Sequence, residues 1–428
     1  MLAGKDDKIK QLQLEVEHLN SLAKASRLIN STLNLDELME IIRKIGRTEL
    51  RAEKATIYLA DEDKEELHSV YLEDKHLNIN LPYGVGIAGT VAKTGDSLII
   101  DDVENDERFF GKIDKVSGFE TKSCLCVPMH IKGEKLIGVF QVLNSKKGKF
   151  TKSDLRFLED LSIQAAIAIE NARLHTEVKQ KEKIEQTLKL ARNIQMGLLP
   201  KQFPPFPDKS QFEIYASIEP AVEIGGDFYD FFLVDDEHLC LVIGDVSGKG
   251  IPAALFMAVA KTLIKAYTIG NYASDDILFK VNNELCQENE QEMFVTIFHG
   301  ILNIHTGELR YSNGGHNPPY ILYSDGTFGG IESTRGMALG VMEDVKYELK
   351  KVRLSKKDTI YLYTDGVNEA MDGDGNEFSY IRLENFFKEI KGSSATELTK
   401  KTMETISRFI DEAPQSDDIT VMALKYLQ

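Results

Sequence analysis

The sequence of 428 residues predicts an α+β protein in which two mixed domains are connected by one long helix. Two stretches of the chain contain short apolar runs with the alternation of strands, interrupted by helical patterns and polar turns. Between them, residues 154–199 contain no Pro, and no Gly before Gly197, which is typical of a continuous helix. The segment "LPKQFPPFP" ends this helix, because its four prolines cannot continue it.

The chain begins with a helical pattern, "KIKQLQLEVEHLNSLAKASRLI", and we assign residues 1–20 to an N-terminal helix or coiled coil. Its apolar side chains recur at alternating spacings of three and four, as in a coiled-coil seam. One amphipathic helix packed on its own domain would show the same pattern, so both interpretations stay open. The seam residues are Ile9, Leu12, Val16 and Leu19.

The first mixed domain is expected over residues 21–172, with a central antiparallel sheet and flanking helices. The strand pattern at 122–145 predicts a hairpin that turns at "KGEK", and a helix from Lys152 closes the domain. The other expected elements are helices at 35–50 and 86–95, and strands at 54–62, 66–74 and 97–103.

Two motifs in this domain have a functional and a structural interpretation. Gly84, Gly86 and Gly89 match the dinucleotide fingerprint, but no buried strand of a βαβ unit leads into them, so a tight turn into a helix is the preferred explanation. Cys124 and Cys126 lie in an apolar alternating run, which favours buried thiols over a metal or redox pair.

Net charge and the distribution of apolar residues argue against nucleic-acid and membrane partners. Fifty-one basic against 68 acidic residues give a net charge of −17, which argues against a nucleic-acid partner. The N-terminal residues have no apolar signal core, and no apolar run reaches membrane length, so we expect no membrane partner and a cytoplasmic location.

The first domain resembles a GAF domain through "GVGIAGTVAKTGDSLIIDDVENDERF" and the run from "SCLCVPMHI" to "QAAIAIENA". The resemblance implies a sensor that binds a small ligand or mediates dimerisation. Cyclic-nucleotide-binding members carry an Asn-Lys…Phe-x-x-x-Asp-Glu signature. Here Ser145 separates Asn144 from Lys146, and Leu155 stands in place of the glutamate, so a GAF domain without a ligand is an equal alternative.

The long helix predicts a coiled-coil linker over residues 173–203. "HTEVKQKEK" is polar on all sides, so this part of the helix has no core of its own. The three-and-four spacing continues after it, and together with the N-terminal helix it predicts a parallel homodimer. The linker seam consists of Ile184, Leu188, Ala191, Ile194 and Leu198.

Aspartates mark the strand ends of the second mixed domain. Because strand ends can converge on one cleft, and clustered carboxylates repel one another without cations, the pattern predicts a metal site. Oxygen ligands without His or Cys pairs favour Mg²⁺ or Mn²⁺, and two such ions about 4 Å apart can activate water for attack on a phosphoryl group. These aspartates are Asp227, Asp245, Asp365, Asp417 and Asp418.

A nucleotide P-loop is the alternative at "GDVSGKG", since a Gly-Lys pair is present. Three residues instead of four separate Gly244 from Gly248, and Gly250 follows Lys249 where Ser or Thr is required. Without that hydroxyl group there is no magnesium ligand, so Asp245 is the better functional candidate.

Residues 210–428 contain a characteristic set of motifs in order: "GGDFYD", "GDVSGKGIPAALFMA", "NGGHNPPY", "GMALGV", "LYTDGVNEAMDGDGNEF" and "SDDITVMALKY". Through them this region resembles the metal-dependent protein phosphatase (PPM) family in its SpoIIE/RsbU-like branch, and "LKLARNIQMGLLP" resembles the segment before the domain. It implies an antiparallel β-sandwich flanked by helices, with two Mn²⁺ or Mg²⁺ ions in a cleft at one end.

By this resemblance, the metal ligands are Asp227, Asp245, the Val246 carbonyl, Asp365 and Asp417. Asp418 stands where the wider family often has asparagine, and it is included among the metal residues. The wider family often has an arginine that binds the substrate phosphate. This sequence has no such arginine before "GGDFYD". Lys249 and Asn317 are its weaker substitutes.

The resemblance implies a sensor-regulated serine/threonine phosphatase that acts on a phosphorylated STAS-type anti-sigma-factor antagonist in a partner-switching pathway. Two alternatives are weighed against it. "GGDFYD" is similar to the GGDEF segment of diguanylate cyclases, although Phe228 replaces its acidic residue, and a catalytically inactive signalling scaffold would also fit. His316 could act as a general acid, but a histidine that fixes its turn is the preferred interpretation.

Overall fold

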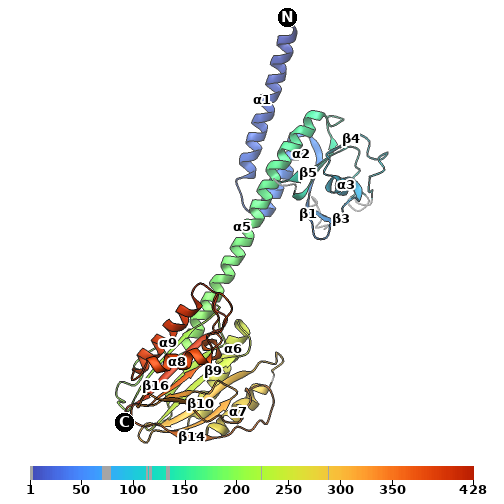
Figure 1. The fold of residues 1–428 in the computed structure, drawn as a ribbon. Helices are drawn as coiled ribbons and strands as arrows, with labels where there is room; N and C mark the ends of the chain where they lie inside the picture. Colours follow the sequence, from blue (N-terminus) through green and yellow to red (C-terminus); the bar gives the residue numbers. More distant parts are fainter. Residues whose placement is uncertain are drawn as a thin grey trace. The chain divides into compact units, whose positions relative to one another are not determined.

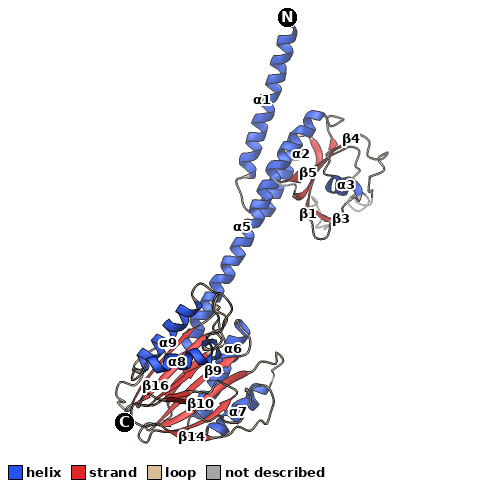
Figure 2. Cartoon of the chain, in the orientation of Figure 1, coloured by secondary structure: helices blue, strands red, loops and turns tan. Residues whose placement is uncertain are grey.

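Figure 1 shows the computed structural model of the chain, in which residues 3–69, 79–111, 114, 118–131, 135–222, 224–287 and 289–428 are described. The chain divides into two compact units, Met1–Lys183 and Ile184–Gln428. Both units combine helices with antiparallel sheets, so the predicted α+β class is confirmed (Figure 2).

The first unit is built on a six-stranded sheet with the order β3-β2-β1-β6-β5-β4. Its described strand pairs are all antiparallel, and the predicted pair of strands at 122–145 is confirmed as β5 and β6. Residues 132–134 of the predicted turn, and residues 70–74 of the predicted strand at 66–74, lie outside the described residues. The strands are β1 (Ala52–Asp61), β2 (Glu66–Ser69), β3 (Asn80–Pro82), β4 (Leu98–Ile100), β5 (Cys124–His130) and β6 (Leu136–Ser145).

The helices of this unit pack with apolar faces on its core. The side chain of Asn34 accepts a hydrogen bond from the Glu37 backbone N–H and thereby caps the N-terminus of α2. The buried face of α2 then repeats at helical spacing, with Leu38 and Ile42 fully buried. The helices are α1 (Ala3–Ile29), α2 (Leu35–Glu49), α3 (Gly86–Thr94) and α5 (Lys152–Leu198), of which the part up to Lys183 belongs to this unit.

The two ends of helix α1 differ in burial. Near its C-terminus, Ala25 and Ile29 are buried in the core of the first unit. The N-terminal part is different, since its apolar residues are more than half exposed: Ile9 53%, Leu12 54%, Val16 55% and Leu19 58%. One end of α1 is therefore part of the domain, and the other presents an apolar stripe without a partner among the described residues.

The glycine motif and the cysteines have structural explanations. Gly84 and Gly86 adopt φ values of +84° and +71°, and a Cβ on Gly89 would meet the Pro82 carbonyl oxygen at 2.6 Å, so these residues form the tight turn into α3. Cys124 and Cys126 are free and fully buried, and burial raises the pKa of the Cys126 thiol. The predicted turn and the predicted buried thiols are confirmed.

The second unit is a β-sandwich between two helical layers. One sheet has the order β14-β11-β10-β9-β8, and the other has the order β13-β12-β15-β16-β7. Side chains of both sheets, such as Ile243 of β9 and Met422 of β16, share one core. Helices α6 and α7 contact the first sheet, and α9 contacts the second. The predicted β-sandwich flanked by helices is confirmed.

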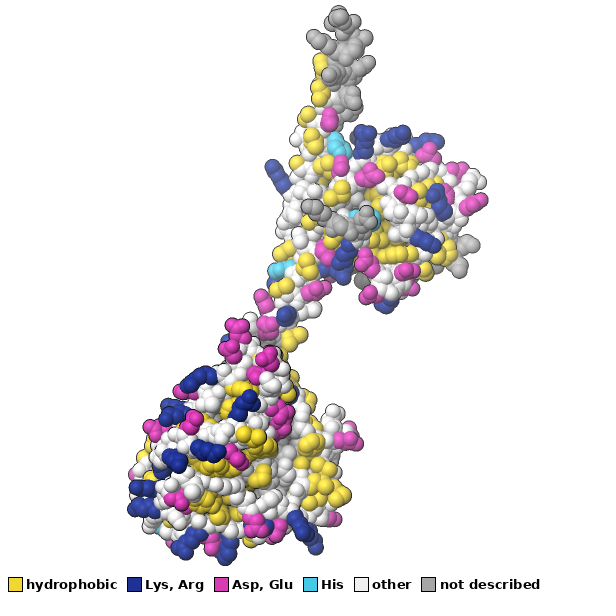
Figure 3. Space-filling view, in the orientation of Figure 1, with side chains coloured by type: hydrophobic (Ala, Val, Ile, Leu, Met, Phe, Trp, Pro, Cys, Tyr) yellow, Lys and Arg dark blue, Asp and Glu magenta, His cyan; other side chains and the backbone are white. Residues whose placement is uncertain are grey.

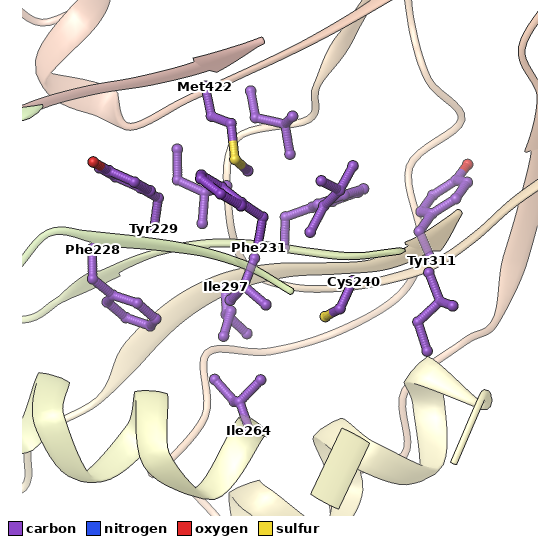
Figure 4. Close-up of a cluster of buried hydrophobic side chains, with 14 of the residues drawn as sticks. Phe228, Tyr229, Phe231, Cys240, Ile264, Ile297, Tyr311 and Met422 are labelled. Atoms are coloured by element: carbon purple, nitrogen blue, oxygen red, sulfur yellow. The ribbon is translucent and has the colours of Figure 1, made fainter. Parts of the chain in front are cut away.

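Successive side chains along the strands of this unit point alternately between the two sheets and towards a helical layer. In Figure 4, Tyr229, Phe231 and Met422 lie between the two sheets, whereas Phe228 extends towards the helical layer that carries Ile264. The strands are β7 (Phe212–Glu219), β8 (Phe228–Leu233), β9 (His238–Val246), β10 (Val295–Asn303), β11 (Glu308–Gly314), β12 (Tyr320–Leu322), β13 (Phe328–Gly330), β14 (Lys350–Arg353), β15 (Thr359–Tyr363) and β16 (Ile419–Tyr426). The helices are α6 (Ile251–Thr268), α7 (Ser274–Cys286), the short 3₁₀ helix η1 (Asp365–Val367), α8 (Ser379–Glu389) and α9 (Ala395–Ile410).

Among the described residues, only helix α6 is long and apolar enough by composition to cross a membrane. Five of its residues, including Met257 and Ile264, are buried against the unit, whereas Ile251, Leu255 and Val259 are exposed. The expectation that no apolar run reaches membrane length was therefore too strict, because α6 has 18 residues of sufficient hydropathy.

Candidate metal centre

The loop before β8 carries Asp227 into the interior of the second unit. Asp227 is 2% exposed, and its Oδ2 accepts hydrogen bonds from the hydroxyl groups of Thr364 (2.7 Å) and Thr420 (2.6 Å). A Cβ on Gly225 would overlap the Asp418 carboxylate, and one on Gly226 would crowd the Val246 carbonyl oxygen. The two glycines are therefore required by the close approach of this loop to its neighbours.

Asp245 lies at the end of β9, opposite Thr296 of β10. Burial, followed by the charges of Asp365 and Asp417, raises the pKa of Asp245 to about 7, while a hydrogen bond with Asp227 opposes this shift. Burial and the charges of Asp245 and Asp418 also raise the pKa of Asp227. The structure thus brings Asp227, from the loop before β8, close to Asp245 at the end of β9.

Asp365 and Asp417 complete the group of interacting carboxylates. Asp365 opens the 3₁₀ helix η1 after β15, and Asp417 lies two residues before β16. Burial raises the pKa of Asp365, and the charge of Asp417 raises it further. At Gly366, a Cβ would overlap the Asp418 carbonyl oxygen, so only glycine allows the two chain segments to lie this close.

Lys249 supplies a positive charge to this group. Its Nζ lies 3.0 Å from Asp417 Oδ1 and donates a hydrogen bond to the Ser416 carbonyl oxygen at 2.5 Å. Both side chains of the ion pair are 40% exposed, so it lies at the accessible edge of the group. The charge of Lys249 also lowers the pKa of Asp365.

Asp418, which the sequence placed among the metal residues, has a different set of contacts. It is 3% exposed, its Oδ1 accepts from the Ala221 N–H at 2.8 Å, and its Oδ2 accepts from the Gly226 N–H at 2.8 Å. Neighbouring residues of an extended segment point in opposite directions, so Asp417 and Asp418 do not share an environment. The Asp418 carboxylate holds the loop that carries Asp227.

Asn317, considered for the substrate phosphate, and His316, considered as a general acid, both have internal partners. Asn317 donates to Asn368 Oδ1 at 3.0 Å. His316 is buried, and its ring nitrogens lie 2.9 Å from Thr296 Oγ1 and 3.1 Å from the Tyr363 carbonyl oxygen. Burial lowers the pKa of His316 to about 4. These contacts fit a histidine that fixes its turn.

The carboxylates of this site differ in how freely they could bind divalent cations. Within the described ranges, no three His, Cys, Asp or Glu side chains surround one point closely enough to hold an ion as they stand. Lys249 draws Asp417 to itself, and two threonine hydroxyl groups hold Asp227. The chemistry nevertheless fits, because buried, mutually repelling carboxylates without His or Cys are the ligands that Mg²⁺ and Mn²⁺ prefer.

Thr364 and Thr420 were missed in the sequence. Each is adjacent or nearly adjacent to a predicted site residue, in "YTDG" and in "SDDIT". Thr420 follows Asp418 by two residues, so the alternation of an extended chain places both side chains on the side of Asp227. That spacing was the available signal.

Comparisons with known proteins agree with this geometry. The family model described as "GAF domain" matches residues 34–169, and the model "Stage II sporulation protein E (SpoIIE)" matches residues 235–427. The second match contains Asp245, Asp365 and Asp417, whereas Asp227 precedes it.

Two curated relatives were found among others. Protein IcfG of Synechocystis sp. is 31% identical over 265 residues, which cover 55% of this chain and 41% of that protein. Phosphoserine phosphatase RsbU of Bacillus subtilis is 29% identical over 272 residues, which cover 63% of this chain and 78% of that protein. The chain thus spans less than half of the first relative and most of the second.

Among solved structures, the SiaA-PP2C domain of Pseudomonas aeruginosa superposes with a TM-score of 0.52 and 21% identity. The superposition covers 58% of this chain and 98% of that domain, and at this identity it supports the fold. The chain therefore contains a region that matches the GAF-domain model, followed by a region that matches the SpoIIE phosphatase model, and it is similar to RsbU over most of that protein.

Proposed function

We propose that this protein is a sensor-regulated, metal-dependent serine/threonine protein phosphatase. The observation that carries the proposal is the convergence of Asp227, Asp245, Asp365 and Asp417 from four separate segments of one β-sandwich. Carboxylates that repel one another inside a protein are costly unless they serve a charged ligand. The similarity to a phosphoserine phosphatase supports the same activity.

The metal ligands in this proposal are Asp227, Asp245, the Val246 carbonyl, Asp365 and Asp417, which would hold two Mn²⁺ or Mg²⁺ ions. When bound, divalent ions would supply the Lewis acidity that activates a water molecule for in-line attack on a phosphoryl group. The protein's own groups orient this site.

The residues around the carboxylates have defined roles in the proposal. Thr364 and Thr420 fix the Asp227 carboxylate, and Asp418 fixes the backbone of its loop. Lys249, beside Asp417 at the accessible edge, contributes the positive charge that would attract an anionic phosphorylated substrate. Asn317 is less suited to this role, since Asn368 already accepts its amide N–H.

The proposed substrate is a phosphorylated STAS-type protein in a partner-switching pathway, and the GAF domain is the proposed sensor. A cavity of about 50 Å³ in the first unit is lined by Lys54, Tyr58 and Phe119, among others. Ligand pockets usually enclose roughly 300–1,000 Å³, so this cavity would have to open for anything beyond a very small ligand. Asn144 is occupied by the Lys122 and Ser123 N–H groups, which supports a structural role for it.

The four cysteines are free thiols in the structure, as expected of a protein from a reducing compartment, and we therefore place the proposed reaction in the cytoplasm.

The test is Mn²⁺-dependent phosphate release by the full-length protein, first from p-nitrophenyl phosphate and then from phosphorylated STAS proteins of the same genome. Turnover should require Mn²⁺ or Mg²⁺ and should be lost with EDTA. The matched control is Asp374→Asn, which removes an exposed aspartate of a neighbouring turn and should retain activity. A well-folded protein that binds Mn²⁺ but releases no phosphate would favour the inactive scaffold.

A further inference from the structure

The end of helix α5 contacts the Asp227 loop through a side chain that the proposed metal chemistry does not use. Gln195 lies in the last turn of α5, within "LKLARNIQMGLLP", and is 6% exposed although it is long and polar. Its Nε2 donates a hydrogen bond of 2.7 Å to the Gly225 carbonyl oxygen. A buried side-chain amide is tolerated where it has such a partner, so this contact fixes the position of Gly225.

A second hydrogen bond joins the same two segments on the other side of Asp227. Tyr229 is 4% exposed, and its hydroxyl group donates to the Pro200 carbonyl oxygen at 2.8 Å. Gly225 and Tyr229 each lie two residues from Asp227. The two hydrogen bonds therefore bracket this aspartate, and both partners belong to the end of α5 or to the residue just after Leu199.

Apolar packing fixes the end of α5 to the sandwich. Leu199 is 5% exposed and belongs to the hydrophobic core that strands of both sheets share. Phe203 follows it and contacts two strands, since its ring centroid lies 4.6 Å from that of Tyr215 on β7 and 5.7 Å from that of Phe231 on β8. The end of α5 is thus a rigid support rather than a free linker at this point.

We infer that Gln195 and Tyr229 are positioning residues that hold Asp227 in place within the carboxylate group. On its other side, the Asp227 loop is held by Asp418. If the α5 side were released, the loop could move and the Asp227 carboxylate would leave the two threonine hydroxyl groups. The inference rests on the proposed metal site and predicts a reduced metal affinity.

The experiment measures Mn²⁺ binding to the full-length protein by the loss of the free-ion EPR signal, without substrate. Gln195→Met keeps the length of the side chain but removes its donor, and Tyr229→Phe removes only the hydroxyl group. Because groups that orient metal ligands typically contribute about 10–100-fold in affinity, each variant should bind Mn²⁺ about tenfold more weakly. At saturating Mn²⁺, turnover should recover towards the wild-type value.

Two matched controls separate positioning from stability. Tyr311→Phe removes a hydroxyl group that also donates to a buried site, the Glu332 carbonyl oxygen at 2.7 Å, but β11 carries none of the metal residues. Gln186→Met makes the same chemical change as Gln195→Met at an exposed position of α5. Both controls should bind Mn²⁺ with wild-type affinity, and Tyr311→Phe should lose as much thermal stability as Tyr229→Phe.

The outcomes distinguish this inference from the proposed function. If Asp245→Asn abolishes Mn²⁺ binding while Gln195→Met and Tyr229→Phe both bind Mn²⁺ as the wild type does, the positioning role is overturned and the metal site stands. If the wild type itself binds no Mn²⁺, both fail. A loss of affinity in Tyr311→Phe equal to that in Tyr229→Phe would also overturn the inference, because the effect would then follow stability alone.

Discussion

Single residues of the candidate site are governed by the energetics of buried carboxylates. Four aspartates approach one another, and the structure offsets their repulsion with the Lys249 ammonium group and the hydroxyl groups of Thr364 and Thr420. The pKa of Asp245 is still raised to about 7, chiefly by burial. A divalent cation would neutralise the charge that these groups leave uncompensated.

Asp245→Asn and Asp365→Asn should each lower turnover at saturating Mn²⁺ by at least about 100-fold, because loss of a ligand weakens ion binding and water activation. The stability of the metal-free protein should hold or rise, since one repelling charge is removed. Phosphate release and thermal unfolding in EDTA measure the two effects. Normal turnover in either variant would contradict the metal assignment, and Asp374→Asn serves as the control.

His299 illustrates the opposite case of a buried base. Its ring nitrogens lie 2.9 Å from Ser274 Oγ and 3.0 Å from Thr268 Oγ1, so it joins the start of α7 to the end of α6. Burial lowers the pKa of His299 to about 3. The unfolded chain takes up this proton near pH 6.5 and the folded protein only near pH 3, so stability is complete above pH 6.5 and is lost as the pH falls.

His299→Gln should therefore make the second unit less stable at pH 7.5 but less sensitive to acid. In the wild type, the protonation of His299 alone should lower the free energy of unfolding by about 2 kcal/mol between pH 7.5 and 5. The variant should not show this pH-dependent loss. Calorimetric unfolding of the full chain at both pH values measures the difference. His305→Gln, at an exposed position, is the control. Equal acid sensitivity of His299→Gln and the wild type would contradict the assignment of this stability loss to His299.

Among the elements, helix α5 has the most consequences for regulation. It contributes to the core of the first unit through residues such as Leu158 and Ile169, and its last turn supports the Asp227 loop. Part of its predicted linker seam is exposed, with Ile184 at 60% and Ile194 at 63%. A continuous helix is stiff, so its phase can be transmitted between its ends.

Insertions near Gln180 should distinguish a stiff linker from a passive tether. At 3.6 residues per turn, four inserted residues rotate the following segment by about 40° beyond a whole turn, whereas seven leave it about 20° short of two turns. Basal and Mn²⁺-saturated turnover should change after the insertion of four residues and remain near the wild-type value after seven. If both insertions behave alike, α5 is a tether, and the regulatory part of the proposal is wrong.

At the scale of the whole molecule, the exposed apolar stripes of α1 and α5 are the features that a monomer leaves unexplained. Apolar side chains gather along α1 (Figure 3), where Ile9, Leu12, Val16 and Leu19 are all more than half exposed. Such stripes on helices with otherwise polar surfaces are typical of coiled-coil seams. We therefore expect a parallel homodimer through α1 and α5.

The double variant Val16→Glu, Leu19→Glu should weaken this dimer, because it places like charges in the seam. Sedimentation of the full-length protein at micromolar concentration measures the change, and Gln13→Glu, which adds a charge outside the seam, is the control. A wild-type protein that sediments only as a monomer would contradict the prediction.

Most elements of the fold and the convergence of the aspartates could be predicted from the amino-acid sequence. The alternation of "LCLVIG", the absence of breakers in α5 and the glycines beside the aspartates are local properties, and local properties determine helices, strands and tight turns. Because the aspartates stand at strand ends, their convergence was also predictable. Their roles as metal ligands stay a prediction.

Tertiary structure alone decided which partner each polar side chain has. Asp417 and Asp418 are neighbours of the same type, yet one pairs with Lys249 and the other holds the Asp227 loop. In the sequence, Gln195 is one of many polar residues of a predicted helix. Only the folded β-sandwich places the Gly225 carbonyl oxygen beside it. These contacts join segments far apart in the chain, and such pairings depend on the packing of whole layers, which no local periodicity records.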